Sequence, residues 1–250
     1  MKNNILEITH LSKNYQDNDG EIEAIKDINL KISEGEFVVI VGPSGCGKST
    51  LLSILANLDK KSGGDLKYNK KEIKVGYMLQ NDSLFPWLNI LDNCLLGLKI
   101  KGKVKEKDKE YVLKLLDMYG LNEFKNKFPN SLSGGMRQRV ALIRTLATKP
   151  DILLLDEPFS ALDAMTRVML ADDVYKMVKD LGKTAIMVTH DIGEAVSIAS
   201  KVVVLTERPC VVKKVYDINY DNRSTPFNNR KEKEFNYYYE KIWRDLDVKL

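Results

Sequence analysis

One stretch decides the fold of this chain: Gly42-Pro43-Ser44-Gly45-Cys46-Gly47-Lys48-Ser49-Thr50. It fits G-x-x-x-x-G-K-[ST], the pattern of a phosphate-binding loop. The apolar residues 37–41 before it predict a buried strand, and the largely apolar residues 50–58 after it predict a buried helix. Backbone N–H groups in the glycine-rich loop and the positive end of the helix dipole would then converge on one anion. The alternative, a glycine-rich turn with a chance lysine, explains neither flanking element.

Two side chains of the loop have expected roles in phosphate chemistry. Lys48 would reach the outer phosphates of a nucleotide, and the Ser49 hydroxyl would ligate Mg²⁺. Cys46 is interpreted as a small residue that the loop tolerates, although its thiol could be alkylated or oxidised there. Together with Cys94 and Cys210 it makes an odd, scattered set, which predicts neither a metal site nor a disulfide framework.

The composition is that of an ordinary globular protein. The chain has 250 residues, of which 44% are hydrophobic and 30% are charged, so it can bury a substantial core as one domain, with room for a subdomain. The net charge of +4 is slight, and the Lys and Arg residues form no basic stripe along the sequence. The charge therefore does not indicate nucleic acid as a partner. No signal peptide is recognisable, and no apolar stretch approaches the ~20 residues that cross a bilayer. We therefore expect a cytosolic protein that reaches a membrane only through a partner.

Polar residues follow three more predicted buried strands: Gln80 after residues 73–79, Asp156 and Glu157 after residues 152–155, and His190 after residues 184–189. Open α/β sheets bind ligands at the carboxyl ends of their strands, so these side chains should meet near the loop. Gln80 and Asp156 are candidate Mg²⁺ ligands, and Glu157 is a candidate general base. His190 could hydrogen-bond a terminal phosphate. The simpler alternatives are a capping role for Gln80 and a helix-start cap for the two acids.

A second glycine-rich helix start is Ser133-Gly134-Gly135, which opens a predicted helix with an apolar face as far as residue 147. Backbone donors, a hydroxyl and the helix dipole make it another anion-binding design, and a plain N-cap is the alternative.

Asp163 precedes a further predicted helix. Tyr15 lies in a predicted polar turn at residues 15–20, where it is either a turn residue or a flat surface for an adenine ring.

The remaining segments indicate how the chain is divided. Residues 83–147 carry helix signals and few strand signals, which predicts an inserted helical subdomain. Within them, residues 84–89 place aromatic and apolar side chains around a proline, as either a core plug or a docking surface. Apolar and polar residues alternate in residues 5–9 and 22–32, which predicts an antiparallel sheet. Residues 60–64 predict a turn. Residues 201–205 predict the last main strand. The tail predicts an amphipathic helix packed on its own domain.

These motifs occur in one fixed order: the phosphate-binding loop, a strand-end glutamine, Leu132-Ser133-Gly134-Gly135, Asp156-Glu157-Pro158 and a strand-end histidine. The set resembles the ATP-binding subunits of ABC transporters over residues 1–210. Residues 84–89 and 136–142 are similar to the nitrate/sulfonate/taurine import subgroup, whose relatives also serve bicarbonate and thiamine-precursor uptake. Met136 stands where a glutamine usually follows the Leu-Ser-Gly-Gly motif. Three further departures are a short stretch at residues 63–75, Cys210 where glycine is common, and a tail beyond Val215 that carries no assignable motif.

The resemblance implies a site shared by two copies that meet head to tail around two ATP molecules. One copy would supply the ATP-binding residues Tyr15, Gly42, Pro43, Ser44, Gly45, Cys46, Gly47, Lys48, Ser49, Thr50, Gln80 and Asp156, with Glu157 and His190 as catalytic residues. Tyr15 would stack on adenine, and Ser49, Gln80 and Asp156 would hold Mg²⁺. The other copy would supply Ser133, Gly134, Gly135 and Asp163.

The resemblance also implies the partners. Transmembrane permease subunits would dock near Gln80–Leu88, and an extracellular solute-binding protein would act through the permease. This places the subunit at the cytoplasmic face of the cell membrane. Closure on ATP would move the permease and hydrolysis would reset it. No residue of this chain should touch the solute, so the sequence does not identify the solute.

The expected fold class is α/β, with a phosphate-loop (RecA-like) ATPase core, an antiparallel β subdomain and an inserted helical subdomain. Residues 1–215 would form a single ABC ATPase domain, with its core in 1–82 and 148–215 and its helical subdomain in 83–147, and residues 216–250 a helical tail. The alternatives are an ATPase of another importer or of an exporter, a non-transport ABC ATPase and a non-catalytic regulator. A single ATPase unit without a long coiled coil argues against the second, and the intact Glu157 and His190 argue against the third.

Overall fold

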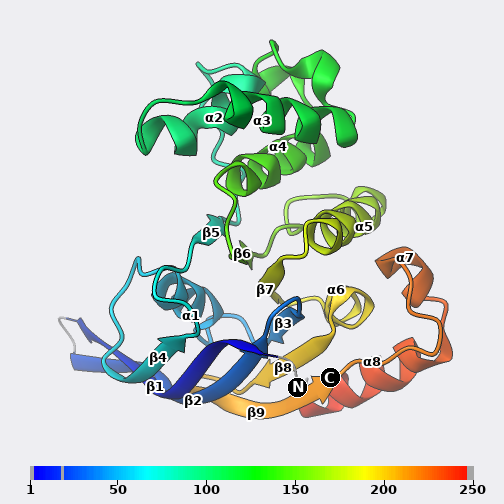
Figure 1. The fold of residues 1–250 in the computed structure, drawn as a ribbon. Coiled ribbons are helices and arrows are strands. Elements are labelled where there is room, and N and C mark those ends of the chain that lie inside the picture. The colour runs from blue at the N-terminus through cyan, green and yellow to red at the C-terminus, as the bar shows by residue number, and fades with distance from the viewer. Residues whose placement is uncertain (1–2, 18–19, 247–250) are drawn as a thin grey trace.

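The computed structural model describes residues 3–17 and 20–246. In this part of the chain the strands form one sheet in the order β4-β1-β2-β9-β8-β3-β7-β6-β5. Figure 1 shows this sheet in the lower body, with helices α2, α3 and α4 as a separate layer above it. The strands are β1 (Asn4–Asp17), β2 (Gly20–Ser33), β3 (Phe37–Val41), β4 (Gly63–Tyr68), β5 (Val75–Met78), β6 (Ile152–Asp156), β7 (Thr184–Thr189), β8 (Lys201–Leu205) and β9 (Cys210–Asp217).

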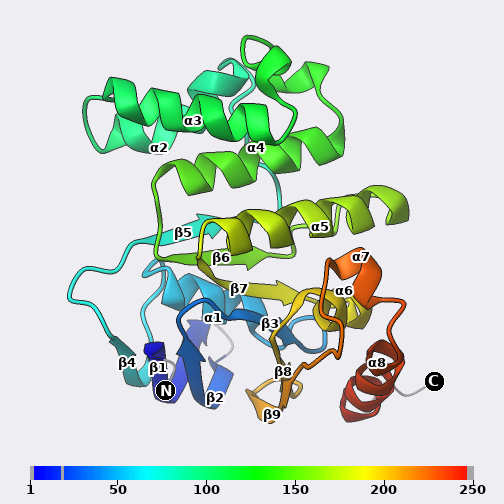
Figure 2. The same ribbon diagram turned by 45° about the vertical axis from the view of Figure 1, so that its right-hand side comes forward.

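The helices fall into two groups, one on the sheet and one in the upper layer (Figures 1 and 2). Those that pack near the sheet are α1 (Lys48–Leu55), α5 (Ala164–Asp180), α6 (Ile192–Ile198), α7 (Pro226–Asn229) and α8 (Lys233–Asp245). Those of the upper layer are α2 (Ile90–Ile100), α3 (Glu106–Met118), α4 (Gly134–Ala147) and two short 3₁₀ turns, η1 (Asn122–Phe124) and η2 (Pro129–Ser131). The predicted α/β class with inserted helices is confirmed.

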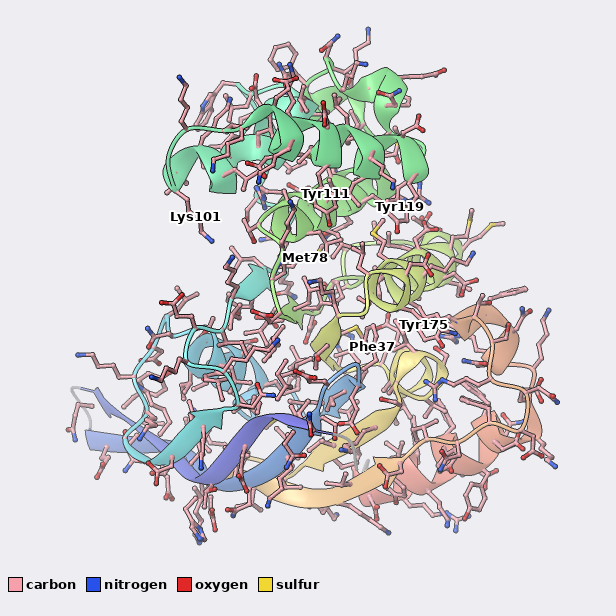
Figure 3. All side chains as sticks on the ribbon, viewed as in Figure 1. Phe37, Met78, Lys101, Tyr111, Tyr119 and Tyr175 are labelled. Carbon is pink, nitrogen blue, oxygen red and sulfur yellow. The ribbon has the colours of Figure 1, made fainter. Side chains whose placement is uncertain are left out.

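The central strands β8, β3, β7, β6 and β5 run parallel to one another. All five residues of β3 are buried, and they alternate between two cores. Val39 and Val41 join the core on the side of α4, α5 and α6, whereas Val38 and Ile40 join the core on the side of α1. Burial on both faces is why these strands read as continuous apolar runs instead of alternating ones. Figure 3 shows Phe37 beside the central strands and Met78 where the sheet meets the helical layer.

The prediction of a turn around Tyr15 is wrong. Strand β1 continues to Asp17, and Tyr15 pairs with Ile22 of β2. This segment is polar and lacks alternating apolar residues. Backbone hydrogen bonds to β2 keep it extended, so the strand continues beyond the part that the sequence pattern predicts. Residues 18–19 of that predicted turn lie outside the described residues.

The predicted turn at residues 60–64 is also shorter than expected, because Gly63 and Gly64 begin β4. Gly64 has φ +78°, and a Cβ there would lie 2.1 Å from the carbonyl oxygen of His10 on β1. Only glycine permits this close approach of two strands. Strand β4 follows β1 along residues Leu6 to Ser12 and forms one edge of the sheet.

The sequence predicted that residues 201–205, which form β8, would be the last main strand, and this prediction is wrong. Strand β9 follows β8, antiparallel to it and parallel to β2. It therefore connects the antiparallel part of the sheet to the parallel part. Residues 211–212 of β9 are half-buried and residues 213–215 are exposed, so they do not show the apolar pattern by which the other core strands were found.

The C-terminal helix α8 packs on its own chain, as predicted for the tail. Ile242 is fully buried in the core that also contains α6, and Phe235, Tyr238 and Tyr239 pack against that core. Within residues 3–17 and 20–246, none of the helices is both long enough and apolar enough to cross a bilayer.

Candidate functional site

The phosphate-binding loop connects β3 to α1, as predicted. Gly45 and Gly47 have φ of +74° and +115°, a region that side chains rarely adopt. Gly42 is required for a different reason, because a Cβ there would lie 2.9 Å from the Cys46 sulfur. Cys46 itself is buried in the core beneath the loop, and burial raises the pKa of its thiol. It therefore packs as a small apolar residue, which makes its thiol poorly reactive.

The Lys48 ammonium folds back over the loop. Its Nζ donates hydrogen bonds to the main-chain carbonyls of Gly42 at 2.8 Å and of Pro43 at 2.9 Å. The side chain is buried, with 6% of its surface exposed. These contacts hold the positive charge over the loop.

The loop and three strand ends meet around one cavity of about 470 Å³. Neighbouring strands β3, β7, β6 and β5 end side by side, which brings together residues far apart in the sequence. The cavity is lined by Ser44, Gly45, Gly47, Lys48, Ser49, Thr50, Gln80, Glu157 and His190. The structure thus assembles the predicted strand-end residues with the predicted loop.

Asp156 lies at the end of β6 with 7% of its surface exposed, and each of its carboxylate oxygens accepts a hydrogen bond. Ser49 Oγ donates to Oδ1 at 3.0 Å, and the Tyr77 hydroxyl donates to Oδ2 at 2.9 Å. Burial and the Asp156 charge raise the pKa of Tyr77 to about 12. Tyr77 was not identified from the sequence, because its place beside Asp156 depends on the register of β5 on β6. In that register Tyr77 pairs with Leu154, two residues before Asp156 and on the same face.

Glu157 is held in a strained conformation beside two other candidate residues. Its φ of +41° is unusual for a residue with a side chain. Its N–H donates to the Val188 carbonyl of β7 at 3.0 Å, which helps to fix the backbone. Its Oε2 accepts a hydrogen bond from Gln80 Nε2 at 3.3 Å and lies 3.1 Å from His190 Nδ1. One carboxylate oxygen therefore connects residues that follow three different strands.

The oxygen donors of the site suit a hard cation. Ser49, Gln80 and Asp156 offer a hydroxyl, an amide carbonyl and a carboxylate, the ligand types that Mg²⁺ prefers. Among the residues that the structure describes, no group of three or more His, Cys, Asp or Glu side chains is arranged to hold a metal ion. A nucleotide site does not need one, because Mg²⁺ is commonly bound by one or two carboxylates together with phosphates and water.

Tyr15 lies on β1 near the loop, with 38% of its surface exposed. Its hydroxyl donates to Asp59 Oδ2 at 2.7 Å, and Lys13 Nζ lies 4.4 Å from the centre of its ring. Lys13 also pairs with Asp59 at 2.7 Å, so the ring is held at both its edge and its face. Lys13 and Asp59 were not identified from the sequence, because they become neighbours only when β1 packs beside the end of α1.

The residues assigned to the opposite copy lie outside this cavity. Ser133 is exposed and caps α4, accepting a hydrogen bond from the Met136 N–H. Asp163 is exposed and caps α5, accepting from the N–H groups of Met165 and Thr166. A Cβ at Gly135 would lie 2.7 Å from the Thr166 side chain, so the two capped helix starts are packed against each other.

Comparison with known proteins shows which family this chain resembles. The profile of the ABC transporter family matches residues 25–160. An uncharacterized ABC transporter ATP-binding protein of Bacillus subtilis (strain 168) is 42% identical, covering 97% of this chain and 95% of its own. An aliphatic sulfonates import ATP-binding protein of Bacillus thuringiensis subsp. konkukian is 39% identical over 85% of each chain. A taurine import ATP-binding protein of Ruegeria pomeroyi is 37% identical, covering 93% of this chain and 89% of its own.

One solved structure is similar to this chain in both fold and sequence. It is a dimeric, post-hydrolysis state of the ATP-binding cassette MJ0796 bound to ADP and Pi. The TM-score is 0.73 and the sequences are 35% identical, with 86% of this chain and 99% of that chain covered.

Proposed function

This chain belongs to the ABC transporter family of ATP-binding proteins, and from this premise we propose that it powers the import of a small anion or related solute. Its reaction is the hydrolysis of ATP. Candidate solutes are those of the nitrate, sulfonate, taurine, bicarbonate and thiamine-precursor transporters, because two relatives are named for sulfonate and taurine import. The observation that carries the proposal is the cavity in which the phosphate-binding loop meets the ends of β5, β6 and β7.

We assign roles in hydrolysis from the contacts around Glu157. Glu157 is the general base that polarises the attacking water, and Gln80 and His190, which both contact its Oε2, orient its carboxylate. His190 also hydrogen-bonds the terminal phosphate. Lys48 and the loop N–H groups hold the phosphates, and the Tyr15 ring, fixed by Asp59, stacks on the adenine.

Mg²⁺ accompanies ATP in this proposal, and the side chains that hold it are Ser49, Gln80 and Asp156. When bound, the ion neutralises charge that develops on the phosphates during phosphoryl transfer. Support comes from the chemistry of these donors and from the burial of Asp156, whose oxygens already accept two hydrogen bonds.

Two copies of the chain form the working unit, with each ATP between them. Ser133, Gly134, Gly135 and Asp163 of one copy face the nucleotide held by the other. The exposure of Ser133 and Asp163 outside the cavity of their own chain supports this arrangement. The solved relative that contains ADP and Pi is also a dimer.

A permease docks beside the helical subdomain, near Gln80–Leu88. A groove of about 510 Å³ runs between β5 and α2 and is lined by Leu79, Phe85 and Ile100 among others. These three apolar side chains are exposed, and Trp87 of the same segment has 69% of its surface exposed. A monomeric protein rarely exposes a continuous apolar surface unless a partner covers it. The permease would carry this subunit at the cytoplasmic face of the membrane and connect it with a solute-binding protein.

The test uses Glu157→Gln, in which hydrolysis is blocked and ATP stays bound. We expect light scattering to show a monomer without nucleotide and a dimer with Mg-ATP, and a turnover assay to show almost no phosphate release. Adding Ser133→Arg to this variant is the control, because a bulky charge at the start of α4 should block closure without touching the ATP held by its own chain. ATP hydrolysis at the parent rate would refute the role of Glu157. A monomer in both conditions would refute the shared site.

A further inference from the structure

Tyr77 connects strand β5 to the carboxylate at the end of β6. Its hydroxyl donates to Asp156 Oδ2 at 2.9 Å, while Ser49 donates to the other oxygen at 3.0 Å. The phenol is thereby oriented with its proton toward Asp156.

The two donors to Asp156 differ in what else they do. Ser49 lies in the first turn of α1, directly after the glycines of the phosphate-binding loop, and its own oxygen is one of the proposed magnesium ligands. Tyr77 has no such second role, and it is delivered by a strand whose backbone is fixed by the parallel pairing of residues 75–78 with residues 152–155. A side chain carried by paired strands of a sheet holds its position accurately.

We propose that Tyr77 is a positioning residue, whose hydroxyl holds the Asp156 carboxylate in the orientation that accepts Mg²⁺. The inference rests on the magnesium role assigned to Asp156. Groups that hydrogen-bond a metal-binding side chain without touching the metal fix its lone pairs and tune its affinity. Removing the Tyr77 hydroxyl leaves Oδ2 of a buried carboxylate without this donor, so the carboxylate can turn away from the metal position.

The test compares Tyr77→Phe with Tyr68→Phe. Tyr68 is a matched control because it also lies on a strand of the sheet and is partly buried, yet its hydroxyl donates at 2.9 Å to the Leu55 carbonyl, away from the cavity. ATP affinity is measured by calorimetry in EDTA and then at increasing Mg²⁺. We expect Tyr77→Phe to raise the Mg²⁺ concentration for half-maximal effect about 10-fold. The affinity of Tyr77→Phe for ATP in EDTA should stay unchanged. In Tyr68→Phe, neither the Mg²⁺ midpoint nor the affinity for ATP in EDTA should change.

Asp156→Asn separates failure of this inference from failure of the magnesium assignment. If Asp156→Asn shifts the Mg²⁺ midpoint and Tyr77→Phe does not, the role of Tyr77 is refuted and the magnesium site stands. If neither variant shifts it, the assignment of Asp156 fails and the inference fails with it. An equal loss of ATP affinity with and without Mg²⁺ in Tyr77→Phe would mark a purely structural tyrosine and would also overturn the proposal.

Discussion

Asn93 on α2 holds the segment that we propose as the permease contact, so replacing it tests how that segment is built. The side chain is fully buried. Its Nδ2 donates to the carbonyls of Phe85 at 3.1 Å, Leu88 at 2.9 Å and Asn89 at 3.0 Å, and its Oδ1 accepts from the Phe85 N–H at 2.8 Å. Asn93→Ala removes all four hydrogen bonds at once.

The magnitude follows from which groups lose their partner. The Phe85 and Asn89 carbonyls each keep a second donor, from the N–H groups of Leu88 and Asn93. The Phe85 N–H and the Leu88 carbonyl lose the bond that the side chain made. At about 1.5 kcal/mol for each of these unsatisfied groups, the free energy of unfolding should fall by about 3 kcal/mol. For a domain of this size that corresponds to a Tm lower by about 10 °C.

The assay combines urea unfolding with two measurements of ATP hydrolysis. Hydrolysis by the isolated subunit should persist, because Asn93 contacts none of the cavity residues. Hydrolysis stimulated by the co-purified permease should fall, because the segment around Trp87 is no longer held in shape. The control is Asn69→Ala, since Asn69 is exposed and makes one side-chain hydrogen bond of 3.4 Å. A loss of less than ~1 kcal/mol in Asn93→Ala would refute the reasoning, because apolar packing alone would then hold the segment.

Two further predictions concern charged groups. Lys48→Ala should weaken ATP binding by removing the ammonium held over the loop, and unchanged affinity in a calorimetric titration would contradict that role. Glu194 on α6 is buried, which raises its pKa to about 7 and makes the folded state bind a proton more tightly than the unfolded state. Its contribution to stability is therefore present below about pH 4.5 and is lost as the pH rises to about 7, on the order of 3 kcal/mol. The free energy of unfolding, measured with urea at about pH 5 and about pH 8, should decrease less between these pH values in Glu194→Gln than in the parent. An equal decrease in both proteins would contradict the prediction.

Most of the cavity could be predicted from the sequence because parallel strands obey a simple geometry. Buried parallel strands are continuous apolar runs, and the polar residue that ends each run must emerge at the same edge of the sheet. Gln80, Glu157 and His190 were therefore expected to lie together before their contacts were known. The loop pattern supplied the position of the phosphates in the same way.

The features that the sequence did not reveal depend on partners far along the chain. Tyr77 looked like an ordinary strand residue, since its contact with Asp156 requires the register of β5 on β6. Lys13 and Asp59 are likewise brought together only by tertiary packing. The end of β1 around Tyr15 and the partly exposed strand β9 lack strong apolar alternation, because backbone pairing with a neighbour, and not burial of side chains, keeps them extended.

The place of β9 in the sheet also bears on how the chain is made. Strand β2, near the N-terminus, finds its parallel neighbour only in residues of β9, close to the C-terminus. During synthesis on the ribosome the β1–β2 hairpin must therefore keep one edge unpaired until the residues of β9 have emerged. Such an edge can pair with any other extended segment, including another nascent chain. Because β9 completes the sheet late, the unpaired edge of β2 stays exposed for most of synthesis. Protection by a chaperone would matter most during that period.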